Sequence, residues 1–195
     1  VNATGRAVEA LTGLDMNLMD YIAAAPEMTL LILICVVMIA DLFVDEENRA
    51  ATFWLSMLAL VITAVVLYAT APSAKTVVFY GAYVSDALSQ VLKLGAVLLV
   101  GVSFLYARDY LRANDLNKGE YYLLGLFGLL GMMIMMSANS LLTMYLGLEK
   151  LAQSMYAKVA IDRNNETSAE SAMKYFILGP IATGALLYGK SWEYR

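Results

Sequence analysis

The chain contains a long stretch without any charged residue, at positions 121–148, where 28 residues separate Glu120 from Glu149. A helix needs about 20 mainly apolar residues to cross the hydrocarbon core of a bilayer. The stretch is long enough for one crossing and the beginning of another. The whole chain is 61% hydrophobic and 15% charged, whereas a soluble domain is about half apolar and about a quarter charged. The sequence therefore predicts a membrane protein.

Six segments have the length and apolarity of membrane-spanning helices, and alternating polarity typical of transmembrane strands is missing. Residues 121–161 are too many for one crossing, and Ser-Ala-Asn-Ser at 137–140 favours a turn between two helices. Pro180 falls inside the last segment and should kink it. The expected fold class is an all-α membrane protein, a single bundle of about six transmembrane helices near 26–44, 50–71, 87–107, 121–137, 141–161 and 169–192.

The composition argues against several kinds of site. The chain has no histidine, the commonest metal ligand, and its single cysteine, Cys35, can neither form an intrachain disulfide nor hold an iron–sulfur cluster. No glycine-rich dinucleotide turn follows a strand pattern. The formal net charge of −4 offers no basic stripe for nucleic acid. We expect no cofactor or metal in this chain, no nucleic-acid partner, and contact with the lipid bilayer.

Basic residues predict the orientation in the membrane, because cytoplasmic connections carry an excess of lysine and arginine. With six crossings, one side has five basic residues and the other has two. The odd-numbered connections should therefore be cytoplasmic and the N-terminus periplasmic. The five are Arg49, Arg108, Arg112, Lys118 and Arg163, and the two are Arg6 and Lys75.

Glu149 is the candidate for proton chemistry, because it follows the uncharged stretch at membrane depth. Inserting a charge there costs roughly 2.5–3.5 kcal/mol, so such a residue commonly marks an ion or proton path. The alternative is a carboxylate near a helix end that reaches the headgroups. Gln153 and Tyr156 lie on the same helix face, at i+4 and i+7. They could order water beside Glu149, or they could pack between helices.

Two lysines are further candidates. Lys174 lies one turn inside the sixth segment and could pair with Glu149, in which case small movements would set the protonation of both groups. Its alternative position is the membrane surface. Lys93 lies near the start of the third segment, where it could support proton transfer or extend its ammonium group to the surface.

Two blocks of sequence carry a family resemblance. Residues 137–149 read SANSLLTMYLGLE and are followed by SMYA at 154–157, while residues 168–179 read SAESAMKYFILG. The chain resembles subunit N of bacterial NADH–quinone oxidoreductase, an antiporter-like subunit in the membrane arm of respiratory complex I. The resemblance implies that Glu149 belongs to a row of buried charges coupling quinone reduction to proton pumping. It gives Lys174 a lesser role near that row.

The chain departs from the family pattern at several positions after Glu149. Lys150 and Lys158 share a helix face with Ser154, about 100° around from Glu149. That face should meet water or an acidic neighbour, unless the chain is altered beyond Glu149. The positions that depart are Lys150, Lys158, Pro180, Lys190 and Glu193.

The resemblance also implies the setting. The family's subunit continues with further helices holding its main pumping lysines, so we expect this chain to be the N-terminal portion of a longer subunit. The expected function is proton translocation in the bacterial inner membrane, in contact with other membrane-arm subunits. NADH, FMN, iron–sulfur clusters and quinone should be bound by other subunits of the complex. The alternatives are a subunit of a multi-component sodium/proton antiporter and a membrane scaffold that transports nothing.

Overall fold

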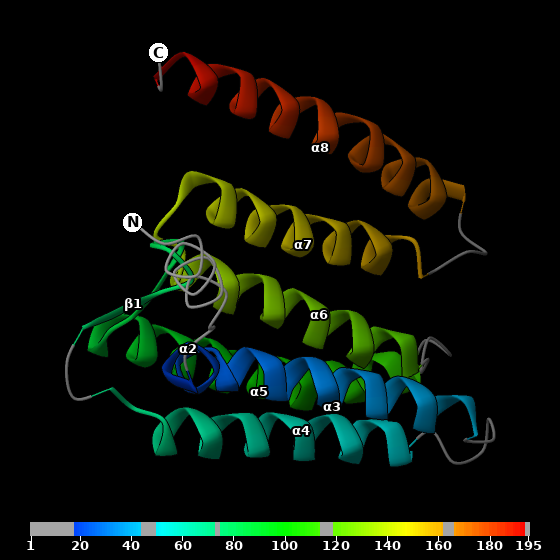
Figure 1. The fold of residues 1–195 in the computed structure, drawn as a ribbon. Helices are drawn as coiled ribbons and strands as arrows, with labels where there is room; N and C mark the ends of the chain where they lie inside the picture. Colours follow the sequence, from blue (N-terminus) through cyan, green and yellow to red (C-terminus); the bar gives the residue numbers. More distant parts are fainter. Residues whose placement is uncertain (1–17, 44–49, 73–74, 114–118, 162–165, 194–195) are drawn as a thin grey trace, which may run out of the picture.

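A computed structural model of the chain describes residues 18–43, 50–72, 75–113, 119–161 and 166–193. Six long helices dominate it, together with one short helix and one two-stranded antiparallel hairpin (Figure 1). The elements in chain order are α2 (Leu18–Ala23), α3 (Ala25–Leu42), α4 (Ala50–Ala69), β1 (Thr76–Val78), β2 (Tyr83–Ser85), α5 (Ala87–Ala113), α6 (Gly119–Met136), α7 (Leu141–Val159) and α8 (Glu166–Glu193).

The long helices alternate in direction and lie roughly parallel to one another (Figure 1). The hairpin lies at the same end of the bundle as the start of α7, and we call this the hairpin end. Because the helices alternate in direction, successive connections lie at opposite ends of the bundle, which is the grouping that the charge count assumes. Of the seven basic residues in that count, Arg6, Arg49, Lys118 and Arg163 lie outside the described residues.

The helices α3, α4, α5 and α6 are long and apolar enough to cross a membrane, with mean hydropathies of 2.1, 2.3, 1.9 and 1.5. Helix α7 is of similar length but carries Glu149, Lys150 and Lys158, which lower its apolarity. The chain is an all-α, multi-pass membrane protein. Of the six expected crossings, these four meet the requirements of length and composition among the described residues.

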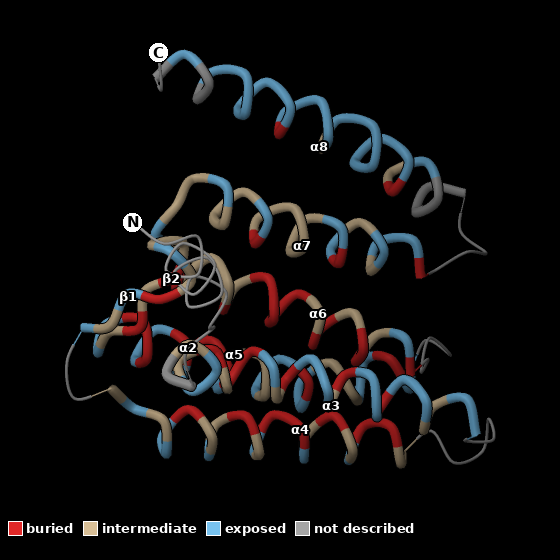
Figure 2. Tube along the Cα trace, viewed as in Figure 1, coloured by how far each residue is buried: buried red, intermediate tan, exposed pale blue. Residues whose placement is uncertain are grey.

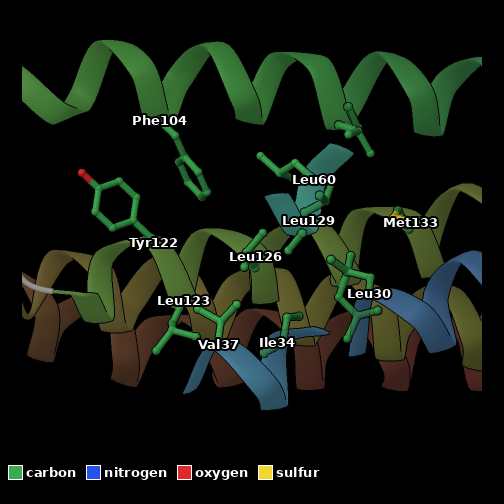
Figure 3. Packing of buried hydrophobic residues seen from close by; sticks show 14 of the residues in the cluster. Leu30, Ile34, Val37, Leu60, Phe104, Tyr122, Leu123, Leu126, Leu129 and Met133 are labelled. Carbon is green, nitrogen blue, oxygen red and sulfur yellow. The ribbon is translucent and has the colours of Figure 1, made fainter. Parts of the chain in front are cut away.

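Helix α6 is at the centre of the packed core. Its residues at 122, 126, 129 and 133 are buried at helical spacing, so that one stripe faces α3, α4 and α5. Figure 3 shows this stripe meeting Leu30, Ile34 and Val37 of α3, Leu60 of α4 and Phe104 of α5. Most of α8, by contrast, is exposed along its length (Figure 2).

Two glycines bring α6 and α7 into backbone contact. A Cβ atom at Gly131 would lie 2.8 Å from the carbonyl oxygen of Gly147 and 2.7 Å from the amide nitrogen of Leu151. A Cβ atom at Gly147 would lie 2.9 Å from the carbonyl oxygen of Gly131. Small residues at such contacts allow membrane helices to approach closely, where van der Waals packing replaces the hydrophobic effect as the main attraction.

The hairpin was not expected from the sequence. Its turn holds Phe79, Tyr80 and Gly81 at φ values of 52°, 54° and 87°. Bulky residues seldom adopt positive φ, and neither aromatic residue is a usual turn signal. The turn is fastened to the linker between α6 and α7, because Asn139 donates hydrogen bonds to the carbonyl oxygens of Gly81 and Ala82 at 2.7 and 3.0 Å.

The helix boundaries have local causes. Ser140 caps α7 by accepting a hydrogen bond from the Thr143 amide at 3.1 Å, so that α6 and α7 end and begin on either side of the expected turn. Asp86 caps α5 in the same way through the Ser89 amide at 2.7 Å, which holds the pKa of this carboxyl below its usual range. Helix α5 continues past its apolar run to Ala113, and α8 continues through Pro180 as one helix.

We expect Gly131→Ala to lower the free energy of unfolding by about 1–3 kcal/mol, because the added methyl group meets backbone atoms that cannot rotate away. Unfolding of the purified protein in detergent measures the change. Gly95→Ala is the matched control, since a Cβ atom there meets nothing within 4 Å. Equal stability of the two variants would show that the close contact does not form.

Candidate functional site

Glu149 lies at the middle of α7 and is half-buried. One carboxylate oxygen is 3.5 Å from the Gln153 amide nitrogen, which is the outer limit of a hydrogen bond. The other oxygen, Oε2, is buried without a hydrogen-bond partner among the described residues. An ionised oxygen without a hydrogen-bond partner is unfavourable in such a place, so a polar group or a water molecule that reached it would stabilise it.

The residues expected beside Glu149 lie on the side of α7 that faces α8. The Tyr156 ring stacks on Tyr175 with 6.3 Å between centroids, and its hydroxyl contacts Gly179. Tyr156 therefore packs α7 against α8. A groove of about 310 Å³ runs between the two helices, lined by Gln153, Tyr156, Ala157, Ala160, Ala172, Met173 and Phe176.

The expected pairing of Lys174 with Glu149 does not form in the described part of the chain. The Lys174 ammonium lies 2.7 Å from the Glu170 carboxylate, and both side chains are about two-thirds exposed, at 68% and 67%. The two residues are four positions apart on α8, where side chains of opposite charge meet readily. Lys174 thus pairs with Glu170 on its own helix and not with Glu149 on α7.

The two lysines that depart from the family pattern, Lys150 and Lys158, lie on aromatic rings, and neither forms an ion pair with an acidic group among the described residues. The Lys150 ammonium lies 4.4 Å from the centroid of Phe127, and that of Lys158 lies 4.3 Å from the centroid of Tyr121. An aromatic face attracts a cation through its electron-rich centre. The two unusual lysines consequently face α6 and are partly buried against it.

Lys93 does not extend to the membrane surface. Its side chain has an exposed fraction of 0%, and its ammonium nitrogen lies 2.6 Å from a carboxylate oxygen of Glu27 on α3. The same nitrogen donates a hydrogen bond to the Tyr83 hydroxyl at 2.9 Å. These three residues form a buried charged cluster at the hairpin end, which we call the Lys93 cluster.

Sequence reasoning missed Glu27 and Tyr83, although one signal was available for Glu27. Both Glu27 and Lys93 lie in the first two turns of their helices, and one antiparallel helix separates those helices in the chain. Both therefore belong to the same end of the bundle, where opposite charges can meet. Tyr83 had no such signal, because it depends on the unexpected hairpin.

Several ionisable side chains lie inside the described part of the bundle. No group of three or more His, Cys, Asp or Glu side chains that could hold a metal occurs in the ranges that the structure describes. The buried ionisable groups there include Glu149 on α7 and the Lys93 cluster. Such groups can bind and release protons when a nearby charge or water changes.

Comparison with known proteins identifies the family. Residues 138–195 match a family described as NADH:quinone oxidoreductase/Mrp antiporter, TM. Proteins named NADH-quinone oxidoreductase subunit N match most of the chain. The chain is a relative of NADH–quinone oxidoreductase subunit N. The subunit N proteins of Alkalilimnicola ehrlichii, Thioalkalivibrio sulfidiphilus and Nitrosomonas europaea are 48%, 47% and 45% identical to the chain. The alignments cover 92%, 90% and 93% of the chain, respectively.

The chain spans about 36–38% of the length of these subunit N relatives. The match confirms the resemblance drawn from the two sequence blocks around Glu149 and Lys174. The alignments cover nearly all of the chain, whereas the family description covers only α7, α8 and the linker before them.

We expect Lys93→Met to lower the free energy of unfolding by about 3–5 kcal/mol, because it leaves the Glu27 carboxylate buried without its cation. The double variant Lys93→Met/Glu27→Gln should recover most of this loss, since no isolated charge remains. Denaturation in detergent measures both. A single variant as stable as the parent would mean that the ion pair is not buried in the folded protein.

Proposed function

We propose that the chain is part of a proton-translocating membrane subunit of NADH–quinone oxidoreductase. The subunit contributes protonatable groups inside the membrane, and other subunits of the complex carry the electron-transfer cofactors and bind quinone. Support comes from the subunit N relatives and from the bundle of apolar helices. The single observation that carries the proposal is the half-buried Glu149 with one partnerless oxygen in the middle of α7.

In this proposal, Glu149 takes up and releases a proton as charges near it change. Its free oxygen Oε2 offers the position for that proton, and Gln153 holds the other oxygen in place. Lys174 has a secondary role, because its exposed ammonium group is paired with Glu170 and is available to neighbouring helices. Redistribution of charge in the complex would then change the protonation of Glu149 through electrostatic interaction.

We expect Glu149→Gln to leave assembly of the complex intact and to reduce proton translocation coupled to quinone reduction several-fold. Glutamine keeps the size of the side chain and one acceptor oxygen, but its amide group cannot bind a proton reversibly. Acidification measured with a pH-sensitive dye in membrane vesicles, alongside NADH oxidation, tests this. Asp109→Asn is the matched control, because Asp109 is an exposed carboxylate on α5. Unchanged translocation in assembled Glu149→Gln would refute the role.

A sodium/proton antiporter subunit is the second candidate, because the matching family description names the Mrp antiporter beside the oxidoreductase. Proton flux that requires sodium and is independent of quinone would favour it. A scaffold without transport remains the third reading. It predicts normal flux in Glu149→Gln and impaired assembly in variants of the contact between α6 and α7.

We also propose that the hairpin end faces the periplasm of a bacterial inner membrane, with the chain crossing in six passes. Arg108 and Arg112, near the end of α5, then lie on the cytoplasmic side. The Arg108 guanidinium packs on the Phe53 ring at 4.6 Å, and Tyr121 and Tyr122 lie at the same end. Aromatic and basic residues commonly gather in this way at the cytoplasmic interface.

Cysteine labelling tests the orientation. In a Cys35→Ser background, Lys75→Cys should react in whole cells with a maleimide that crosses only the outer membrane, because Lys75 is exposed at the hairpin end. Ala113→Cys, exposed at the opposite end, should react only after the inner membrane is opened. The reverse labelling pattern would place the hairpin end in the cytoplasm.

A further inference from the structure

The Lys93 cluster contains polar atoms that the described protein atoms do not satisfy. Both carboxylate oxygens of Glu27 lack a hydrogen bond of ordinary geometry, although one of them lies 2.6 Å from the Lys93 ammonium. Both amide atoms of Gln90 are also buried without a partner among the described residues, and the Ser137 hydroxyl lies beside the Tyr83 hydroxyl without a hydrogen bond of ordinary geometry. Buried polar groups in proteins are nearly always hydrogen-bonded, to ordered water when no protein atom serves.

These atoms belong to one location. Gln90 and Lys93 are three positions apart on α5 and therefore share a face. The Tyr83 hydroxyl accepts a hydrogen bond from Lys93 and donates one to the carbonyl oxygen of Ala23 at 3.2 Å. Ser137 is held against β2, because its carbonyl oxygen accepts a hydrogen bond from the Val84 amide at 2.9 Å.

We propose that Glu27, Tyr83 and Lys93, together with Gln90 and Ser137, form a second buried ionisable site, which holds ordered water and exchanges protons at the hairpin end of the bundle. The site is separate from Glu149. It shares with the proposed function only the premise that the subunit moves protons.

The proton balance follows from the contacts. In the resting state the Glu27 carboxylate and the Lys93 ammonium form an ion pair with no net charge. A proton arriving through the water binds Glu27, which leaves a neutral acid beside the ammonium and a net charge of one. Its release restores the pair. Tyr83 keeps its proton throughout, since burial and the charge of Glu27 raise the pKa of its hydroxyl.

The site lies near the hairpin end of the bundle. Lys93 lies six residues inside α5, which is about 9 Å along the helix axis. Gln90 is one turn nearer the end, and Asp86 precedes the helix as the adjoining charged group. The groups facing Lys93 are thus Glu27 from α3 and Tyr83 from β2, with Asp86 within electrostatic reach. A purely structural pair would need no unsatisfied amide and hydroxyl groups around it.

The test uses the assembled complex in vesicles and compares Lys93→Met, Glu27→Gln and the double variant. The double variant has no isolated charge, so we expect it to assemble and oxidise NADH while translocating protons several-fold less than the parent. Full translocation by the assembled double variant would overturn the proposal and leave the pair a structural contact. If Glu149→Gln reduces translocation in the same series, the proposed function stands even when this inference fails.

Two further measurements keep the proposal testable if the double variant does not assemble. A high-resolution map of the unaltered complex should show water between Glu27, Gln90 and Ser137, and a dry cluster would overturn the proposal. The difference between the infrared spectra of the unaltered complex and of Glu27→Gln should contain a protonated-carboxyl band that appears on acidification and shifts in heavy water. Identical spectra of the two would also refute the proposal.

Discussion

The backbone contact between α6 and α7 decides where the charged side chains of α7 lie. Gly131 and Gly147 allow the two helices to touch, so α7 has one face pressed against α6 and an opposite face turned to α8. Lys150 and Lys158 lie toward the first face, on aromatic rings. Glu149 lies on the other side with Gln153. The same contact therefore places the two lysines against α6 and the Glu149 carboxylate on the side of α7 with Gln153.

The bundle handles buried charge in three ways. Lys93 is neutralised by a carboxylate on another helix, while Lys150 and Lys158 rest on aromatic faces. Glu149 has only a long contact to an amide on its own helix. The first two arrangements stabilise the charged form of the lysine, whereas Glu149 has no charged or aromatic partner among the described residues. Glu149 differs in this respect from Lys93, Lys150 and Lys158.

The helices were predictable because membrane crossings require long apolar segments, and the turn at 137–140 was visible in its small polar residues. The hairpin was not predictable, since Phe79 and Tyr80 adopt a backbone conformation that their side chains do not favour. Lys93 was recognised as a candidate, but its burial depends on Glu27, and single-helix reasoning cannot show which charges on different helices meet. The pairing of Lys174 with Glu170 was overlooked although the spacing of four favoured it.

The hydrogen bonds from Asn139 to the hairpin turn tie together two connections that are distant in the chain. The start of α7 is therefore anchored to the segment that leads into α5. If α7 tilts against its neighbours, it must pivot about this anchored end, and displacement grows along the helix. Glu149, about 13 Å from Ser140, would shift moderately, and Lys158 would sweep through a wider arc across Tyr121.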